Sequence, residues 1–136
     1  MDILRSIDIE DTVRKALLPY MACYCPPLPS EYVLPNVLVR QVGGSEANKI
    51  DAFTVTLDAR ASTEAEASEL LRNAVGILMK TAADQTTAIR YVNVNTSGSW
   101  GSDPVRPDLA MYSATLQITA HQETYYSLRR RVNNGK

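Results

Sequence analysis

The sequence predicts an α+β fold in which a four-stranded, mainly antiparallel sheet carries a long helix packed on one face. Three observations lead to this prediction. Residues 36–42 and 52–60 read as two strands of a hairpin, and the second alternates apolar and polar residues. Residues 63–82 carry apolar side chains at helical steps. Two more strands follow at 89–95 and 109–122, so that with an N-terminal helix the order is α-β-β-α-β-β.

Length and composition indicate one globular domain. The chain has 136 residues, of which 45% are hydrophobic and 21% charged, as in ordinary globular proteins. We expect an N-terminal helix within residues 1–18, a proline-rich connection at 19–35, an α/β core at 36–122 and a basic C-terminal tail at 123–136.

Charge is unevenly distributed along the chain. The net charge is -1, which does not favour general binding to polyanions. The first half, residues 1–68, has six Lys or Arg against ten Asp or Glu, whereas residues 69–136 have eight against five. Such opposed halves are compatible with subunits arranged head to tail.

The sequence carries no signal for membrane insertion or export. No apolar run has the roughly 18–20 residues needed to cross a bilayer. The N-terminus lacks the basic and apolar regions of a signal peptide. We therefore expect synthesis in a cytosol and no membrane partner.

The N-terminal third should contain one helix and then an extended connection. Residues 3–18 are predicted to be helical, with Asp8 as a possible N-cap where the helix breaks or restarts. Pro19 should end it, because proline disfavours helical geometry at the preceding residue. Four further prolines between residues 20 and 35 predict an extended segment without regular structure.

The first hairpin and the long helix are the best-defined elements. Gly43 and Gly44 permit positive φ where the chain should reverse, and a polar loop is expected over residues 43–51. Thr63 and Glu66 have the spacing of a capping box at the start of the helix.

The second half of the sheet is predicted with a long intervening loop. Val92 and Val94 should face inward from the strand at 89–95. Residues 96–108 contain two glycines and two prolines and should form a loop. The alternating segment 109–122 is long enough to project beyond the compact domain.

Cys23 and Cys25 are the only cysteines, and we expect semi-buried thiols in a loop. A disulfide across one residue is strained, and a cytosol disfavours it. A structural zinc site usually needs four ligands, and the single histidine, His121, is distant in sequence. We expect no metal site.

Catalytic machinery is not indicated. His121 falls on the polar face of its predicted strand, and Asp58 should lie on the exposed face of another. Glu64, Glu66 and Glu69 are typical of the charges at a helix start. Gly43-Gly44 lacks the lysine and the following helix of a phosphate-binding loop. We expect no catalytic residue and no cofactor.

A nucleic-acid-binding sheet is a competing interpretation. Such a sheet could use Tyr91, Tyr112 and the adjacent arginines at 129–131. However, the sequence lacks the aromatic-rich signature with which small RNA-binding sheets stack bases. Trp100 lies in the predicted loop at 96–108, where it either packs on its own core or anchors a subunit contact.

Several segments, taken in order, resemble the phage tail terminator family, also known as tail-completion or head-tail joining proteins. Residues 34–44, Leu-Pro-Asn-Val-Leu-Val-Arg-Gln-Val-Gly-Gly, look like its first strand and turn. The segment from 51–55 through 63–65 resembles its second strand and the start of its long helix. Ser-Gly-Ser-Trp at 97–100, then Asp-Pro and the strand at 112–116, resemble its glycine-tryptophan loop and last strand. The resemblance covers about residues 34–120.

This resemblance implies a structural virion protein. Its members form a homo-oligomeric ring, typically hexameric, that caps the tail tube, ends its polymerisation and provides the surface on which the DNA-filled head docks. The implied partners are the major tail tube protein and a head-side neck or stopper protein, and genomic DNA passes through the lumen without sequence-specific binding. The implied location is the head-tail junction, after synthesis in the bacterial host cytoplasm.

The contacts of such a ring are expected from the loops at 43–51 and 96–108 and from the basic tail. The candidate interface residues are Gly43, Gly44, Glu46, Lys49, Trp100, Asp103, Arg106, Arg129, Arg130 and Arg131.

Two other classes remain open. One is a different phage neck component, a head-side adaptor or stopper; adaptors are mostly helical and stoppers mostly β, so the mixed order here favours a terminator. The other is a small non-viral α+β binding module. An enzyme ranks last.

Overall fold

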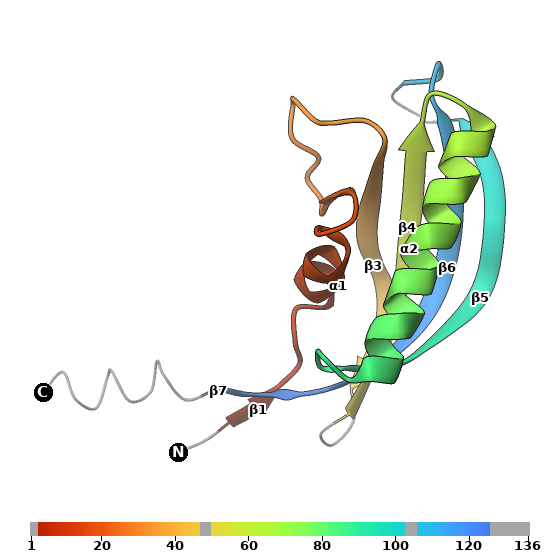
Figure 1. Cartoon of the computed structure of the whole chain (residues 1–136). Helices are drawn as coiled ribbons and strands as arrows, with labels where there is room; N and C mark the ends of the chain where they lie inside the picture. Colours follow the sequence, from red (N-terminus) through yellow and green to blue (C-terminus); the bar gives the residue numbers. More distant parts are fainter. Residues whose placement is uncertain (1–2, 47–49, 103–105, 126–136) are drawn as a thin grey trace, which may run out of the picture.

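A computed structural model describes residues 3–46, 50–102 and 106–125 as an α+β fold (Figure 1). Its elements in chain order are β1 (Ile3–Arg5), α1 (Ile9–Leu17), β2 (Ala22–Tyr24), β3 (Asn36–Glu46), β4 (Ile50–Ala61), α2 (Glu64–Asp84), β5 (Ile89–Ser102), β6 (Ala110–His121) and β7 (Glu123–Tyr125). β1 and β7 pair in a separate two-stranded sheet, and the other seven elements form the main body of the described fold.

The main sheet has the strand order β2-β3-β4-β6-β5 and is antiparallel except where β2 runs parallel to β3. The predicted mainly antiparallel sheet is confirmed, but it has five strands rather than four. The additional strand, β2, lies in the segment predicted to be an irregular connection. Ala22–Tyr24 precede the prolines, so their N–H groups remain available to pair with residues 36–38.

Both helices cover one face of this sheet, and no helix of the described residues lies on the opposite face, which we call the helix-free face (Figure 1). α2 packs over β4, β6 and the edge strand β5, and α1 packs over β3 and β2. From β4, Phe53, Val55 and Leu57 point into the core beneath the helices. Alternation along the strand sends Thr56, Asp58 and Arg60 to the helix-free face.

The N-terminal helix is shorter than predicted. Residues 3–5 form β1 and pair with β7, and α1 begins only at Ile9. Asp8 is its N-cap, since its Oδ1 accepts a 3.1 Å hydrogen bond from the backbone N of Asp11. Asp8 has extended backbone geometry, which separates the strand from the helix.

Gly43 and Gly44 do not form the predicted reversal. β3 continues to Glu46 and pairs with β4 throughout, with a bulge between Gln41 and Gly43. Gly44 has φ +150°, and a Cβ there would lie 2.5 Å from the carbonyl oxygen of Ala52. Glycine is needed for this close approach between strands rather than for a turn.

α2 confirms the predicted long helix. Thr63 is the N-cap, and its Oγ1 accepts a 3.2 Å hydrogen bond from the backbone N of Glu66. The Glu66 carboxylate reaches back to the backbone N of Ser62 at 3.4 Å, one residue before the position of an ideal capping box. The helix ends at Asp84, and Gln85 follows in the left-handed conformation.

The predicted loop at 96–108 is largely strand. β5 runs to Ser102, so that Trp100 pairs with Tyr112 of β6. Three register irregularities along β5 let an edge strand accommodate glycines that otherwise signal a loop. The predicted strand 109–122 ends at His121, and β7 then occupies the start of the predicted tail. No helix in the described residues is long and apolar enough to cross a membrane.

Candidate functional site

The helix-free face carries a buried polar cluster centred on Asp58. Oδ2 of Asp58 accepts a 2.9 Å hydrogen bond from Nε of Arg40, and Oδ1 accepts one of 2.6 Å from Oγ of Ser113. The three side chains come from the neighbouring strands β3, β4 and β6. The prediction that Asp58 is exposed is wrong, because the residue is only 5% exposed.

A cavity of about 730 Å³ lies beside this cluster. Residues 28–32 of the proline-rich segment form one wall, and the ends of β3, β4 and β6 form the others. It is lined by Leu28, Pro29, Ser30, Tyr32, Leu38, Arg40, Asp58, Arg60, Arg106 and Met111.

The other two arginines of the cavity are, like Arg40, held by neighbouring groups. The guanidinium of Arg60 lies 4.8 Å from the centroid of the Tyr32 ring, and Arg60 is 4% exposed. Arg106 forms two hydrogen bonds to the carboxylate of Asp108, at 3.1 and 2.8 Å. Asp108, and after it Tyr32, raises the pKa of Arg106, and Arg106 lowers the pKa of Asp108.

Among the described residues, the cavity lining combines apolar side chains with three arginines, each of which has a partner. Arg40, Arg60 and Arg106 contribute three guanidinium groups, against the carboxylates of Asp58 and Asp108. Guanidinium groups present planar donors that match carboxylates.

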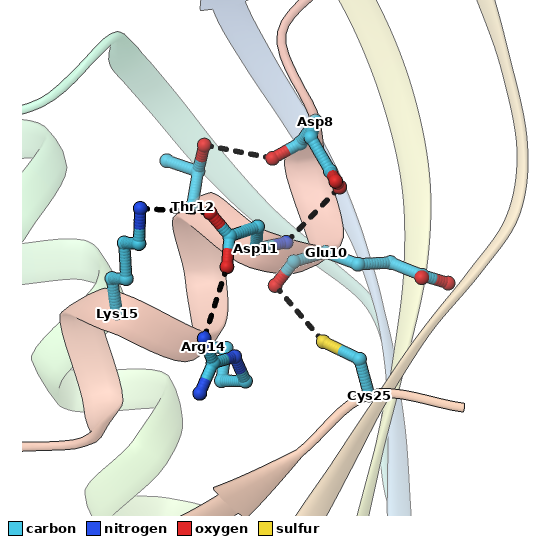
Figure 2. Close-up of polar contacts among 7 residues, drawn as sticks. All are labelled: Asp8, Glu10, Asp11, Thr12, Arg14, Lys15 and Cys25. Atoms are coloured by element: carbon cyan, nitrogen blue, oxygen red, sulfur yellow. Dashed lines mark hydrogen bonds and ion pairs between the residues drawn. The ribbon is translucent and has the colours of Figure 1, made fainter. Parts of the chain in front are cut away.

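A second polar cluster surrounds the start of α1 (Figure 2). Asp11 pairs with Arg14 at 3.1 Å and with Lys15 at 2.9 Å, and these hydrogen bonds, that of Lys15 first, lower the pKa of Asp11. The Glu10 side chain accepts a 2.8 Å hydrogen bond from the backbone N of Gln41, on β3. These contacts cap the helix and bind it to the sheet, so the cluster has a structural role.

The two thiols belong to the same region. Cys23 lies within β2 rather than in a loop and is buried, and burial raises the pKa of its thiol to about 12. Cys25 is partly buried, as predicted; burial raises its pKa, and its thiol donates to the carbonyl of Glu10 at 3.4 Å (Figure 2). Within residues 3–46, 50–102 and 106–125, no three His, Cys, Asp or Glu side chains gather to hold a metal ion.

The predicted interface residues fall at two ends of the sheet. Gly43, Gly44 and Glu46 lie at the far end of the β3–β4 hairpin. The backbone of Trp100 and the side chain of Arg106 lie at the other end, near the cavity. Lys49, Asp103 and the arginines at 129–131 lie outside the described residues.

Sequence reasoning missed most of the cavity. The polar face of the adjacent strands β3 and β4 carries Arg40, Asp58 and Arg60. Charged residues at these alternating positions could have indicated a polar cluster from the sequence alone. Tyr32 reaches the cavity only because the proline-rich segment folds back over the sheet. The spacing of residues in the sequence does not predict this fold-back. Neither the protein-family models nor the curated proteins compared with this chain gave a match.

Proposed function

We propose that this protein is a structural component of a phage tail, a terminator. Copies of it form a ring, hexameric in the proposal, that caps the tail tube, stops its polymerisation and provides the docking surface for the head. The ring sits at the head-tail junction of the virion, binds the major tail tube protein and a head-side neck protein, and lets genomic DNA pass through its lumen. Its function is binding geometry, without a catalytic step.

The observation that carries the proposal is the placement of the candidate contact residues at opposite ends of one sheet. The β3–β4 hairpin carries Gly43, Gly44 and Glu46 at one end, and Trp100 and Arg106 lie near the other. A ring subunit between tail and head needs two such separated surfaces. The order of segments over residues 34–120, which resembles tail terminators, points in the same direction.

The α+β architecture also bears on the rival neck components. A head-side adaptor is expected to be mostly helical and a stopper mostly β, whereas this chain combines two helices with a five-stranded sheet in its described part. A small non-viral binding module is the remaining alternative, and the arginine-lined cavity is the feature that favours it.

Electron microscopy of lysates tests the proposal, using a phage that carries this gene and its derivative with the gene disrupted. Filled heads without tails, beside overlong or unjoined tails, are expected. Normal tails with leaking or empty heads would move the protein to the head side of the neck. Intact infectious virions would refute the structural role.

A further inference from the structure

The two-stranded sheet of β1 and β7 stands apart from the main body. In the described part of the chain, the two strands pack on each other far more than on any other element. Figure 1 shows them leaving the body at the end where β4 begins and β6 finishes. Their residue pairs are Ile3 with Tyr125, Leu4 with Thr124 and Arg5 with Glu123. A two-stranded sheet of this size is marginal in water unless something packs on it.

Large apolar side chains are exposed at this same end. Ile3 and Leu4 are 41% and 48% exposed. Ile50 pairs with His121 at the end of β6, Tyr91 lies near the start of β5, and both are also exposed. Exposed apolar side chains that gather in one region are typical of a surface that contacts a partner.

Both strands leave the body from one anchoring point, the buried carboxylate of Asp51. Ser6, which follows β1, donates a 2.6 Å hydrogen bond to Oδ2, and Gln122, which precedes β7, donates one of 3.0 Å to Oδ1. Ile7 is buried in the core. The chain is therefore fixed from Ser6 onward, and only the residues up to Arg5 need to change direction for β1 to pair elsewhere.

We infer that β1 is exchanged between copies, so that the β1 strand of one chain pairs with the β7 strand of a second copy in the register seen within the chain. The two strands carry complementary charges, because Arg5 of β1 and Glu123 of β7 form a 2.9 Å ion pair. Exchange keeps this ion pair and the backbone pairing, and it brings together the ends that expose Ile3, Leu4 and Tyr91. Exchange of an identical element is a low-cost route to association.

The anchoring at Asp51 limits where the second copy can lie. Three extended residues span about 10 Å. The accepting β7 must therefore belong to a molecule that lies against this end of the first. In the proposed ring, each copy gives β1 to one neighbour and accepts β1 from the other. The inference thus deepens the proposed function and rests on it for the cyclic form.

Cysteine cross-linking tests the exchange, in a full-length background that carries Cys23→Ala and Cys25→Ala. Leu4→Cys is placed in one chain and Thr124→Cys in a second, differently tagged chain, because these residues are opposite in the register. The mixed chains are oxidised and separated without reductant. A disulfide between the two tags is expected, and chains that carry both cysteines should form covalent species of two or more chains.

The matched control uses a pair inside the main sheet. Thr54 and Gln117 are opposite each other on β4 and β6, with side-chain oxygens 3.4 Å apart. A chain carrying Thr54→Cys and Gln117→Cys should cross-link only within itself, and a mixture of the two single variants should give no disulfide between tags.

Tyr91 provides a second, independent measurement, the strength of self-association in sedimentation velocity runs over a range of concentrations. Tyr91→Ala should weaken association about tenfold, because it removes an aromatic side chain from the contact. Val33 is equally exposed, at 62%, but lies at the opposite end of the sheet, beside Asn36. Val33→Ala should therefore leave association unchanged.

Two cross-linking results would overturn the exchange. One is a Leu4→Cys, Thr124→Cys chain that closes its disulfide only within itself at every concentration. The other is a mixture without a disulfide between tags, in variants that unfold at the urea concentration of their background. Equal effects of Tyr91→Ala and Val33→Ala would exclude the apolar end as the contact. The phage experiment is separable: intact virions together with a disulfide between tags would refute the tail role and leave the exchange standing.

Discussion

Asp58 of β4 and Ser113 of β6 face each other across the helix-free side of the sheet, joined by a 2.6 Å hydrogen bond. The same carboxylate holds Arg40 on the other neighbouring strand, so one buried group ties three strands together. The wall of the cavity depends on this link.

Removing the Asp58 charge should destabilise the fold. Asp58→Ala leaves Arg40 and Ser113 without their buried acceptor, and we expect a loss of about 2–4 kcal/mol in the free energy of unfolding. Urea denaturation followed by circular dichroism measures it. Asp84→Ala, which breaks an exposed pair with Lys80, is the control and should cost less than about 1 kcal/mol. Equal effects of the two substitutions would contradict a structural role for the Asp58 cluster.

Gly44 and Gly43 should differ sharply in their tolerance of alanine. Gly44→Ala places a Cβ 2.5 Å from the carbonyl oxygen of Ala52 at φ +150°, and should cost about 1–3 kcal/mol. Gly43→Ala meets only the Thr54 side chain, at 3.8 Å, and is the matched control. Thermal unfolding of both variants distinguishes them, and similar melting temperatures would rule out the close approach at Gly44.

Substitution of Gly76 by alanine should stabilise the protein, in contrast to substitution of Gly44. It lies within α2, and a Cβ there meets nothing within 4 Å. Gly76→Ala should raise the free energy of unfolding by about 0.5–1 kcal/mol, because alanine loses less backbone entropy in a helix. Chemical denaturation provides the measurement. A destabilised variant would mean that the groove beside Gly76 is filled in the folded protein.

The hydroxyl group of Thr63 should stabilise the start of α2. Thr63→Ala removes the acceptor for the backbone N of Glu66 and should cost about 1 kcal/mol, whereas Thr63→Ser keeps the cap and most of the stability. The comparison uses the same denaturation assay. If serine fails to preserve stability, the methyl group rather than the hydroxyl is the stabilising part.

The buried Cys23 thiol should make stability fall in alkali. Its pKa is about 12 in the folded chain against an ordinary value of 9.0, so the unfolded chain loses this proton first. Between pH 9 and 12 the unfolded state binds fewer protons, and the free energy of unfolding therefore decreases as pH rises. Cys23→Ala should flatten this decline relative to Cys25→Ala, as urea titrations at several pH values can show. An identical slope in both variants would contradict the assignment.

The sequence predicted those elements whose signals are local. The capping residue and apolar stripe of α2, and the alternation of β4 and β6, survive in the structure because each depends on neighbours within a few residues. β1 and β2 were missed because three-residue strands are defined by distant partners, residues 123–125 and 36–38. The full length of β5 was not predicted, because glycines in a sequence are as typical of a loop as of an irregular edge strand.

The candidate site divides in the same way. Arg106 was identified from the sequence, but the cavity it borders is assembled from three strands and a folded-back segment. Burial of Asp58 follows from that assembly and not from strand periodicity, which describes only which face a residue occupies.

The position of β6 in the sheet affects how the chain can fold while it is still being synthesised on the ribosome. β6 lies between β4 and β5, although it is synthesised after both. Until residues 110–121 have emerged, β4 and β5 cannot be joined, and the edge of β4 stays open to foreign strands. A nascent chain stalled before residue 110 should therefore require a chaperone, whereas release of β6 closes the sheet in one step.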